Sequence, residues 1–294
     1  MKNKGLTISM IFEAESANYG EGIGNITSLK KISRGSGNMY TYISRQAIRY
    51  NIINQMCEDR TPLSIDSSVI QFAPSATIKD YPEIDLFGYM KTVKKEGSKT
   101  RAAVVRLSNA VSLESYNSDL EFLTNKGLFD RYIKQGGEAK GGNIAQSEIH
   151  RSYYAYTITI DLEKIGIDEN DKIEITNEEK AERVNALLRT VLFLHRDIKG
   201  RRENLSPIFI IGGLYDIKNP FFENCLKIDK NNLMIDNIKD VLKLDNEIKE
   251  NTMCGMLGSP FSNSNDIKTE LNNIDISEMF NRLNHLITDY YQSI

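Results

Sequence analysis

The order of the segments with a strand-like or a helical hydrophobic pattern restricts the fold more than any other feature of this sequence. Strand-like segments alternate apolar with polar residues or are apolar throughout, whereas helical segments carry an apolar stripe. The strand-like segments are residues 6–12, 101–113, 153–162 and 207–214, and the helical ones are residues 40–56 and 177–196. The order strand, helix, strand, strand, helix, strand predicts an α+β fold of the ferredoxin-like or RRM-like type, βαββαβ.

Three of these segments also predict which side chains face the core. In residues 6–12 the alternation predicts a strand with one buried face. In residues 40–56 helical spacing places Tyr50 on the buried side. Tyr154 and Tyr156 alternate in step with two isoleucines in the third strand. We therefore expect these tyrosines to pack in the core rather than to stack on nucleic-acid bases.

Two stretches are too long to be simple connections between these elements. Residues 57–100 separate the first helix from the second strand, and residues 114–152 separate the two central strands. We predict that both are insertions into a single domain that spans residues 1–294. Residues 223–294 follow the last predicted strand as a C-terminal extension, in which a terminal helix begins near Asp275.

A glycine-rich loop and the helix after it carry the strongest functional signal, although the net charge of the chain is −3. Five basic residues and no acidic one lie between Gly22 and Cys57, and a polyanion responds to local charge. Glycine lets a backbone approach a ligand and leaves N–H groups for phosphate oxygens. We predict that this segment grips a nucleic-acid backbone; the alternative is a surface loop without a ligand. The predicted contacts are Tyr19, Gly20, Asn25, Lys30, Lys31, Arg34, Arg45, Gln46 and Arg49.

Two further basic clusters lie later in the chain. The turn HRDIKGRREN connects the second helix to the last strand and either contacts RNA or serves solubility. We expect its basic side chains to emerge near one edge of the sheet; they are Arg196, Lys199, Arg201 and Arg202. For the other cluster, a solvated surface is as good an interpretation as nucleic-acid binding. Its residues are Lys91, Lys94, Lys95, Lys99, Arg101 and Arg106.

Several familiar sites are excluded by their patterns. GEGIGN fails the dinucleotide pattern G-x-G-x-x-G because residue 25 is Asn, and no G-K-[ST] follows it. The HRD at residues 195–197 lacks the Asn that a kinase loop has five residues later. The histidines and cysteines have no metal-ligand spacing, so we expect no catalytic residue, metal or cofactor. Without a signal peptide or a bilayer-length apolar run, we expect a cytoplasmic protein with no membrane partner.

Several motifs together resemble one known family. They follow one another in the family's order and cover the chain from Phe12 to about Phe222. The motifs are FEAESANYGEGIGNITSLKKISRGSGNMYTYISRQAIRY, DLFGYM, SNAVSLESYNSDLEF, YYAYTITIDL and RRENLSPIFIIGG. On these residues the chain resembles the CRISPR-associated autoregulator family of the DevR type. Its members are RAMP-superfamily backbone subunits of type I-B Cascade complexes.

The resemblance implies a shape like a right hand, with an RRM-like palm, finger-like residues 57–100 and a thumb-like loop over residues 114–152. It implies guide RNA (crRNA) as the ligand, held by phosphates and sugars while base pairing supplies specificity. The matching positions are Lys30, Lys31, Arg34, Arg45, Gln46 and Arg49. The implied partners are copies of the chain placed head-to-tail, other Cascade subunits, and target DNA reached through the guide.

The expected function is therefore a non-catalytic subunit that polymerises along guide RNA in an antiviral surveillance complex and exposes the guide for pairing. The runner-up is a RAMP-type endoribonuclease, because some related backbone proteins cleave RNA. In that case Glu13, Glu15, Asp85 or Asp119 would act as a base or hold a metal. A DNA-binding autoregulator is a third possibility, which no helix-turn-helix pattern supports.

Overall fold

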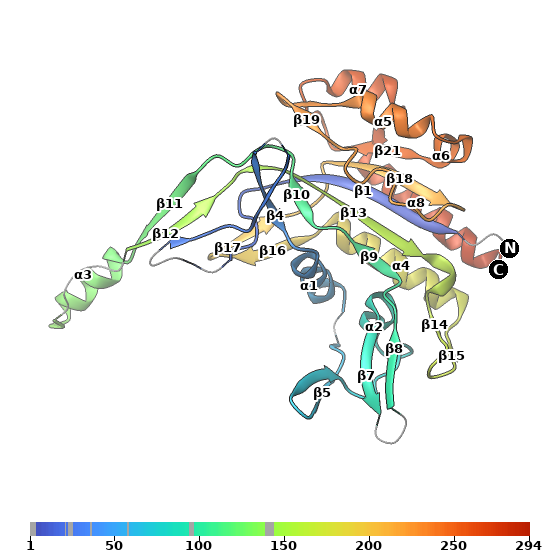
Figure 1. Ribbon diagram of the computed structural model, residues 1–294, viewed down its shortest axis with the longest axis horizontal. Helices are drawn as coiled ribbons and strands as arrows, with labels where there is room; N and C mark the ends of the chain where they lie inside the picture. Colours follow the sequence, from blue (N-terminus) through green and yellow to red (C-terminus); the bar gives the residue numbers. More distant parts are fainter. Residues whose placement is uncertain are drawn as a thin grey trace.

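The computed structural model describes residues 4–20, 22, 26–35, 37–57, 59–93, 97–138 and 144–294. The predicted contact residue Asn25 lies outside these ranges. A large sheet crosses the centre of the molecule, and two projections leave it in different directions (Figure 1). No helix in the described ranges is long and apolar enough to cross a bilayer.

The central sheet contains nine of the strands formed by the described residues. Their order is β22-β21-β18-β1-β13-β10-β4-β3, and β9 also pairs with β13. The strands are β1 Gly5–Ala14, β3 Lys31–Ser33, β4 Met39–Ile43, β9 Val105–Leu107, β10 Ala110–Ser112, β13 Ser152–Asp161, β18 Phe209–Tyr215, β21 Met253–Met256 and β22 Ile274–Asp275. The pairs are antiparallel except for β21 and β22. The four strands predicted from the sequence are thus neighbours, in the order β18, β1, β13 and β9–β10.

Three helices cover one face of this sheet and form the larger hydrophobic core with it (Figure 1). They are α1 Arg45–Met56, α4 Asn177–Leu192 and α8 Ile276–Gln292. Each begins at a residue whose side-chain oxygen accepts a hydrogen bond from a backbone N–H of the first turn, which satisfies an otherwise unpaired donor. The capping residues are Ser44, Thr176 and Asp275.

The C-terminal extension covers much of the opposite face of the sheet. Its side chains pack on Ile11, Phe209 and Ile211 and form a second core. The extension contains β19 Ile228–Asp229, β20 Asn232–Leu233, α5 Ile235–Leu242, α6 Asn246–Asn251 and α7 Ser264–Glu270, besides β21, β22 and α8. The prediction that residues 6–12 have a single buried face is therefore wrong. Thr7 and Ser9 are as buried as the apolar residues between them, because the C-terminal extension covers the face of the sheet on which they lie. The alternation of residues within one strand gives no information about this additional layer.

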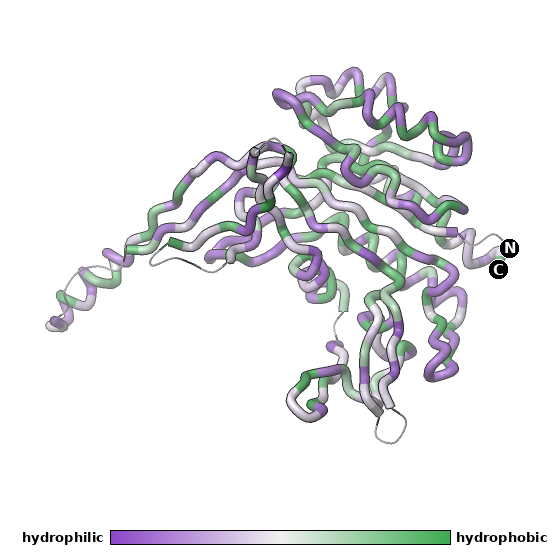
Figure 2. The backbone as a smooth tube through the Cα atoms, viewed as in Figure 1, coloured by the Kyte–Doolittle hydropathy of each residue, from purple (hydrophilic) through white to green (hydrophobic). Residues whose placement is uncertain are grey.

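The first projection is a long arm, made by the insertion of residues 114–152 together with a short strand from the glycine-rich loop (Figure 1). Its elements are β2 Ile26–Thr27, β11 Asp119–Thr124, α3 Lys126–Lys134 and β12 Ile144–Ile149. Figure 2 shows hydrophobic residues in this arm as well as in the central strands. In the arm many of them face solvent, including Phe122, which is 57% exposed.

The second projection contains most of the insertion of residues 57–100. It consists of β5 Leu63–Asp66, β6 Val69–Phe72, α2 Pro82–Phe87, β7 Tyr89–Val93 and β8 Gly97–Arg101. A small core of its own is formed around Ile78 and Ile84. The remaining elements are the 3₁₀ turn Leu162–Lys164, β14 Ile167–Asp168, β15 Ile173–Glu174, β16 His195–Ile198 and β17 Arg201–Asn204.

Three predicted elements differ from the structure. The helix expected over residues 40–56 begins at Arg45, because the preceding residues pair with β3 and β10 as strand β4, and Tyr50 is 66% exposed. The strand expected over residues 101–113 is divided into the end of β8, then β9 and β10. The second predicted helix ends at Leu192, four residues early, because the next residues pair with β17 as strand β16.

Candidate nucleic-acid interface

The side chains of α1 line a cleft of about 390 Å³ next to strand β9. We call this the α1 cleft. Arg45 and Arg49 are one helical turn apart and both line it, as their spacing of four residues predicts. Gln46 lies between them. The remaining lining residues are Phe87, Ala103, Val105, Arg106 and Leu107.

Hydrogen bonds at the start of α1 fix the position of this cleft. The side chain of Asn109, which lies between β9 and β10, accepts a hydrogen bond from the backbone N–H of Arg45 at 2.9 Å. Asn18 donates to the capping hydroxyl of Ser44 at 3.0 Å. The hydroxyl of Ser108 accepts from the N–H of Thr157 at 2.9 Å. Ser108 and Asn109, at the break between β9 and β10, therefore stabilise the fold, because Asn109 binds the start of α1 and Ser108 binds β13.

The arginines of the α1 cleft differ in their charge environments. Arg106 donates two hydrogen bonds to Asp161, at 3.0 and 3.1 Å. Arg49 lies 3.8 Å from Glu83 and 5.0 Å from the ring centre of Phe87, and burial lowers the pKa of its guanidinium. Arg45 is exposed, and no carboxylate of the described residues forms a salt bridge with it. Of the three arginines, Arg45 is therefore the one whose charge remains fully available to an anion.

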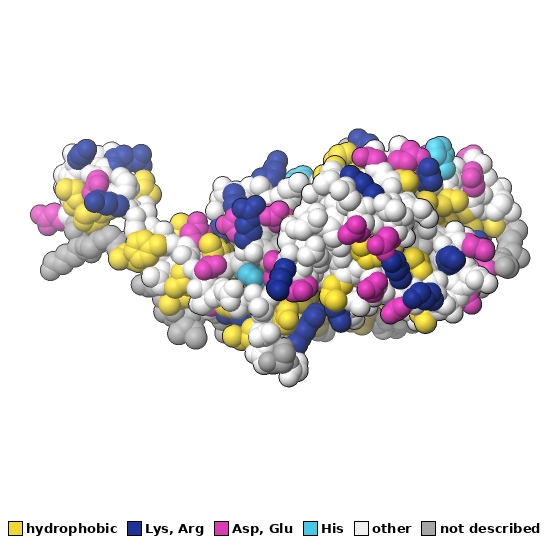
Figure 3. All heavy atoms as spheres, turned by 90° about the horizontal axis from the view of Figure 1, so that it is seen from above, with side chains coloured by type: hydrophobic (Ala, Val, Ile, Leu, Met, Phe, Trp, Pro, Cys, Tyr) yellow, Lys and Arg dark blue, Asp and Glu magenta, His cyan; other side chains and the backbone are white. Residues whose placement is uncertain are grey.

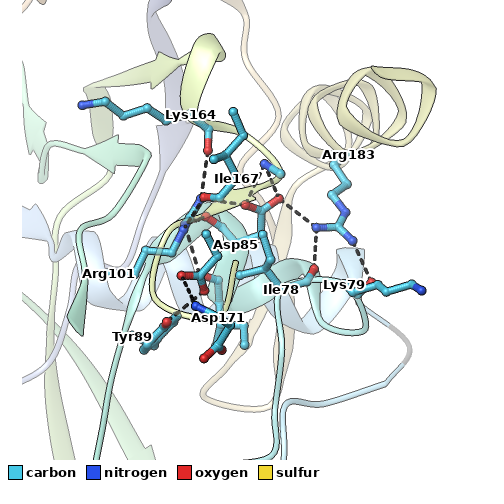
Figure 4. Close-up of polar contacts among 12 residues, drawn as sticks. Ile78, Lys79, Asp85, Tyr89, Arg101, Lys164, Ile167, Asp171 and Arg183 are labelled. Carbon is cyan, nitrogen blue, oxygen red and sulfur yellow. Dashed lines mark hydrogen bonds and ion pairs between the residues drawn. The ribbon is translucent and has the colours of Figure 1, made fainter. Parts of the chain in front are cut away.

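A buried ion cluster positions the wall of the cleft that contains Phe87 (Figure 4). Asp85 is fully buried and binds Arg101 and Arg183, each at 2.8 Å. It also accepts a hydrogen bond from the N–H of Gly166 at 2.9 Å. A carboxylate with three donors of this kind is structural, since its oxygens are already occupied. The motif DLFGYM thus anchors α2 and orients the residues that follow Asp85.

A second group of predicted residues lies at the base of the arm and fastens it. Lys31 forms a salt bridge of 2.7 Å with Glu148 of β12. Lys199 lies 4.6 Å from the ring centre of Tyr19 and 3.3 Å from the hydroxyl of Ser147. These contacts join the glycine-rich loop, the arm and the β16–β17 hairpin. They engage the cationic groups within the protein and leave less of their charge for a ligand.

The backbone of the glycine-rich loop is also less available than predicted. The N–H of Gly20 donates to the carbonyl of Ser28 at 2.8 Å, and the N–H of Lys30 donates to Asn18 at 2.7 Å. The amide of Gly20 is therefore already paired within the loop, while the contact of Gly20 with RNA stays a prediction. The Lys30 and Arg34 side chains are exposed, and the Arg34 guanidinium lies 4.6 Å from the ring centre of Tyr40.

The basic turn HRDIKGRREN is a hairpin whose arginines are paired with carboxylates. Arg196 is 5% exposed and lies 2.6 Å from Glu203, so the expectation that it emerges at the surface is wrong. Arg201 binds Glu15 at 2.9 Å and Glu203 at 3.0 Å. Burial lowers the pKa of Arg201, but the two carboxylates outweigh it, and the net shift of the pKa is upward. We call these four residues the hairpin cluster.

The outermost arginine of the hairpin, Arg202, binds Asp197 at 2.8 Å with both side chains exposed. In the lysine-rich cluster, Lys91 is 1% exposed and binds Asp171 at 2.7 Å, while Arg101 belongs to the Asp85 cluster. Neither a solvated surface nor a binding role describes these two residues. Lys94 and Lys95 lie outside the described ranges.

Basic residues that the sequence did not single out lie at the tip of the arm. Figure 3 shows lysine and arginine side chains gathered there beside hydrophobic ones. Helix α3 contributes Lys126, Arg131 and Lys134, and its Leu128 and Tyr132 are 52% and 51% exposed. The amphipathic pattern of residues 126–134 was the signal that could have located this surface. The sequence analysis placed Arg106 in the lysine-rich cluster and Phe87 in the DLFGYM motif. It missed that both lie beside α1, because that helix is distant from them in sequence.

The tyrosines of β13 do not form a base-stacking platform. Tyr154 and Tyr156 are 0% and 2% exposed in the core, which confirms the prediction from their alternation. Tyr153 packs on Phe261 of the C-terminal extension, with ring centres 5.6 Å apart, and its hydroxyl donates to Asn231 at 2.9 Å. This aromatic face of the sheet is thus occupied by the protein itself.

Comparison with known proteins gives consistent results. The family described as "CRISPR-associated negative auto-regulator DevR/Csa2" matches residues 6–232. The CRISPR-associated protein Cas7/Cst2/DevR of Myxococcus xanthus is 27% identical over 163 residues, which are 49% of this chain and 52% of that protein. The chain therefore spans about half the length of this curated relative in the match.

Two solved structures resemble the whole chain. One is described as a CRISPR RNA-guided surveillance complex, pre-nicking, and has a TM-score of 0.59 at 10% identity. The other is described as a CRISPR RNA-guided surveillance complex and has a TM-score of 0.57 at 12% identity. Each match covers 98% of this chain and 99% of the other. At this identity the likeness shows a shared mixed α+β fold.

Proposed function

The chain belongs to the CRISPR-associated DevR/Csa2 family, and from that premise we propose that it is a guide-RNA-binding backbone subunit of a Cascade-type surveillance complex. One observation carries the proposal. The α1 cleft presents Arg45, Gln46 and Arg49 on one wall, and Arg45 is exposed without a salt bridge to a described carboxylate. Arginine and amide side chains on one helical face bind phosphate and ribose groups without reading base sequence.

We further infer that the chain is a single domain with an RRM-like palm. The order β18, β1, β13 and β9–β10, with α1 and α4 on one face, supports this assignment. The projection of residues 57–100 would be the fingers and the arm of residues 114–152 the thumb. Because the C-terminal extension covers the opposite sheet face, RNA would follow the α1 cleft and not the face that RRM domains use.

Exposed apolar side chains on both projections support assembly into a polymer. The β5–β6 hairpin directs Leu63, Ile65 and Ile70 to one face, and these are 63%, 72% and 68% exposed. A second apolar surface lies on the arm. Two different surfaces of this kind fit a head-to-tail contact between copies, which propagates without closing into a ring. In the assembly, other Cascade subunits would cap the polymer, and target DNA would pair with the guide. The place of action would be the cytoplasm.

The proposal is tested by a titration of the purified protein with labelled guide-length RNA. Replacing both Arg45 and Arg49 with alanine is expected to weaken binding about 100-fold, since each charge-assisted contact contributes about 1.5 kcal/mol. The slope of log affinity against log salt should become shallower by about 1.4, for two lost phosphate contacts. Arg202→Ala is the matched control, because Arg202 is already paired with Asp197. Equal effects of the double variant and the control would contradict the proposal.

Three of the four carboxylates named for the endoribonuclease alternative are engaged by arginines. Glu13 binds Arg151 at 2.6 Å, and Glu15 and Asp85 bind arginines as described above. Within the described ranges, no group of three His, Cys, Asp or Glu side chains could hold a metal ion. We therefore propose a subunit without catalytic residues. Cleavage of labelled RNA by the purified chain in the presence of Mg²⁺ would overturn that part of the proposal.

A further inference from the structure

Two arginines of the α1 cleft have a carboxylate neighbour, and their contacts with it differ. Arg106 donates two hydrogen bonds to Asp161, at 3.0 and 3.1 Å. Arg49 lies 3.8 Å from Glu83, which is beyond hydrogen-bonding distance, and its side chain donates no hydrogen bond within the described ranges. The contact between Arg49 and Glu83 is therefore electrostatic and loose, and an anion that enters the cleft can replace it.

Glu83 itself is held close to the cleft. It lies in the first turn of α2, and its side chain is 18% exposed. Two residues later, the buried Asp85 anchors that helix through Arg101 and Arg183 (Figure 4). The backbone of Glu83 cannot move away from the cleft without breaking this buried ion cluster, which is costly. The negative charge of Glu83 therefore stays beside the cleft.

Arg49, in contrast, is able to exchange its partner. Its side chain is 36% exposed and lines the cleft, and its guanidinium lies 5.0 Å from the ring centre of Phe87. A contact with the face of a ring leaves the N–H groups of the guanidinium available. A phosphate can accept two of these N–H groups in parallel, a geometry that the pair with Glu83 lacks. Exchange of the carboxylate for a phosphate is therefore favourable.

We propose that Glu83 is an autoinhibitory counter-ion of the α1 cleft, which competes with RNA phosphate for Arg49. This inference rests on the function proposed above and concerns the regulation of the same site. In the free chain Arg45 presents its full positive charge, whereas Glu83 partly neutralises the charge of Arg49. A phosphate binds Arg49 only by displacing Glu83. Each copy of the chain therefore binds RNA more weakly than its arginines alone would allow.

Weak binding by each copy suits a subunit that acts in a row with others. When several copies are joined on one strand, each further contact forms at a high effective concentration, and the contacts reinforce one another. An isolated copy whose cleft is partly neutralised releases an RNA that it alone holds. Glu83 thus favours RNA that several copies share over RNA that a single copy encounters.

The inference is tested by titrating the purified full chain with labelled guide-length RNA at low salt. Glu83→Gln removes the charge and keeps the shape of the side chain, and it should raise the RNA affinity about fivefold, the factor for a partly exposed ion pair. The same substitution in a chain that also carries Arg49→Met should change the affinity less than about twofold, because the carboxylate then has no arginine to neutralise.

Glu250→Gln is the matched control, because Glu250 is an exposed glutamate of α6 in the C-terminal extension and its loss changes the net charge equally. Its RNA affinity should equal that of the unaltered chain. Glu83→Ala is a second variant in case Glu83→Gln impairs folding, and thermal melts verify each chain.

Two results would overturn the inference while leaving the proposed function intact. One is an RNA affinity that the loss of the Glu83 charge leaves unchanged or lowers. The other is an equal gain in affinity with and without Arg49, which would show that Glu83 does not act through that side chain. Absence of RNA binding by both the unaltered chain and Glu83→Gln would refute the proposed function, and the inference with it.

Discussion

The α1 cleft and the hairpin cluster use the same side chain for opposite purposes. Both come from basic stretches of the sequence. Arg45 is exposed and has no salt bridge within the described ranges, whereas Arg196 and Arg201 share the buried carboxylate of Glu203. The difference is that the fold places carboxylates next to Arg196 and Arg201 and none next to Arg45 within the described ranges. A cationic stretch therefore indicates a binding site only after its carboxylate neighbours in space are known.

The energetic consequences of the two arrangements also differ. An exposed arginine contributes little to the stability of the fold. When it binds a phosphate of a nucleic acid, counterions leave the nucleic acid, and their release favours binding. A buried arginine has lost its hydration and depends on its partner, so removing that partner leaves an uncompensated charge. Substitution of Arg45 should alter RNA affinity and not stability, and substitutions in the hairpin cluster should do the reverse.

The largest effect is expected from Glu203→Ala. Glu203 is 7% exposed, and it also accepts hydrogen bonds from the N–H groups of Glu15 and Ser16 at 2.8 and 3.1 Å. Its loss leaves Arg196 buried without a partner and should lower the free energy of unfolding by about 3 to 5 kcal/mol. Urea denaturation followed by circular dichroism measures this change.

Asp197→Ala is the matched control for Glu203→Ala, because Asp197 belongs to the same hairpin but binds Arg202 at the surface. We expect no measurable loss of stability from it. If both variants unfold at the same denaturant concentration, the distinction between buried and exposed pairs in this hairpin fails. A Glu203→Ala chain that is stable but no longer binds RNA would place the hairpin cluster in the interface.

Much of this fold is predictable because its elements depend on local patterns. β1, β13, β18, α4 and α8 follow from periodicity, and the spacing of Arg45 and Arg49 follows from the helical repeat. The start of α1 is not local in this sense. Residues 39–43 have β-forming side chains and become a strand because β10 pairs with them. That pairing joins segments separated by a whole insertion.

The binding residues were less predictable than the fold for the same reason. The partners of Lys31 and Arg201 are Glu148 and Glu15, which lie far from them along the chain. A search for acid-free stretches examines sequence neighbours only. Glu203 lies within the turn itself and could be identified from the sequence. Its burial could not be predicted, because it depends on the packing of β1 against the hairpin.

A moderate effect is expected from Glu148→Gln. This variant tests whether Lys31, like Lys199, holds the base of the arm to the rest of the protein. Glu148 binds Lys31 and accepts from the N–H of Leu29 at 2.7 Å. Its neutralisation should lower the free energy of unfolding by about 1 kcal/mol and change RNA affinity less than twofold, within about 0.4 kcal/mol. Denaturation and RNA titration of one preparation measure both quantities.

Glu138→Gln is the control for that variant, since Glu138 is exposed elsewhere in the same insertion. If Lys31 instead binds a phosphate, releasing it from Glu148 should strengthen RNA binding, and its salt dependence should become steeper. An increase in affinity for Glu148→Gln but not for Glu138→Gln would therefore show that Lys31 contacts RNA and does not mainly stabilise the base of the arm.

The smallest effect is expected from acidification, which acts at the base of the arm through His150. This residue is 5% exposed, and its Nδ1 lies 2.7 Å from the hydroxyl of Thr41. Burial lowers the pKa of His150, and the charge of Glu114, a backbone contact with Ser115 and the charge of Asp119 oppose the shift only in part. The folded chain therefore resists protonation of a group that the unfolded chain protonates near pH 6.5.

The sign of the pH dependence follows from this difference in proton binding. Above about pH 6.5 neither state holds the proton, so His150 contributes no slope. As the pH falls below that value, the unfolded chain binds the proton first, and stability declines until the folded pKa is reached. His150→Asn should remove this part of the decline in denaturation curves between pH 7 and pH 5, whereas the exposed His285→Asn should retain it. Identical curves for both variants would show that the arm is fastened by Lys31 and Lys199 without a contribution from the protonation state of His150.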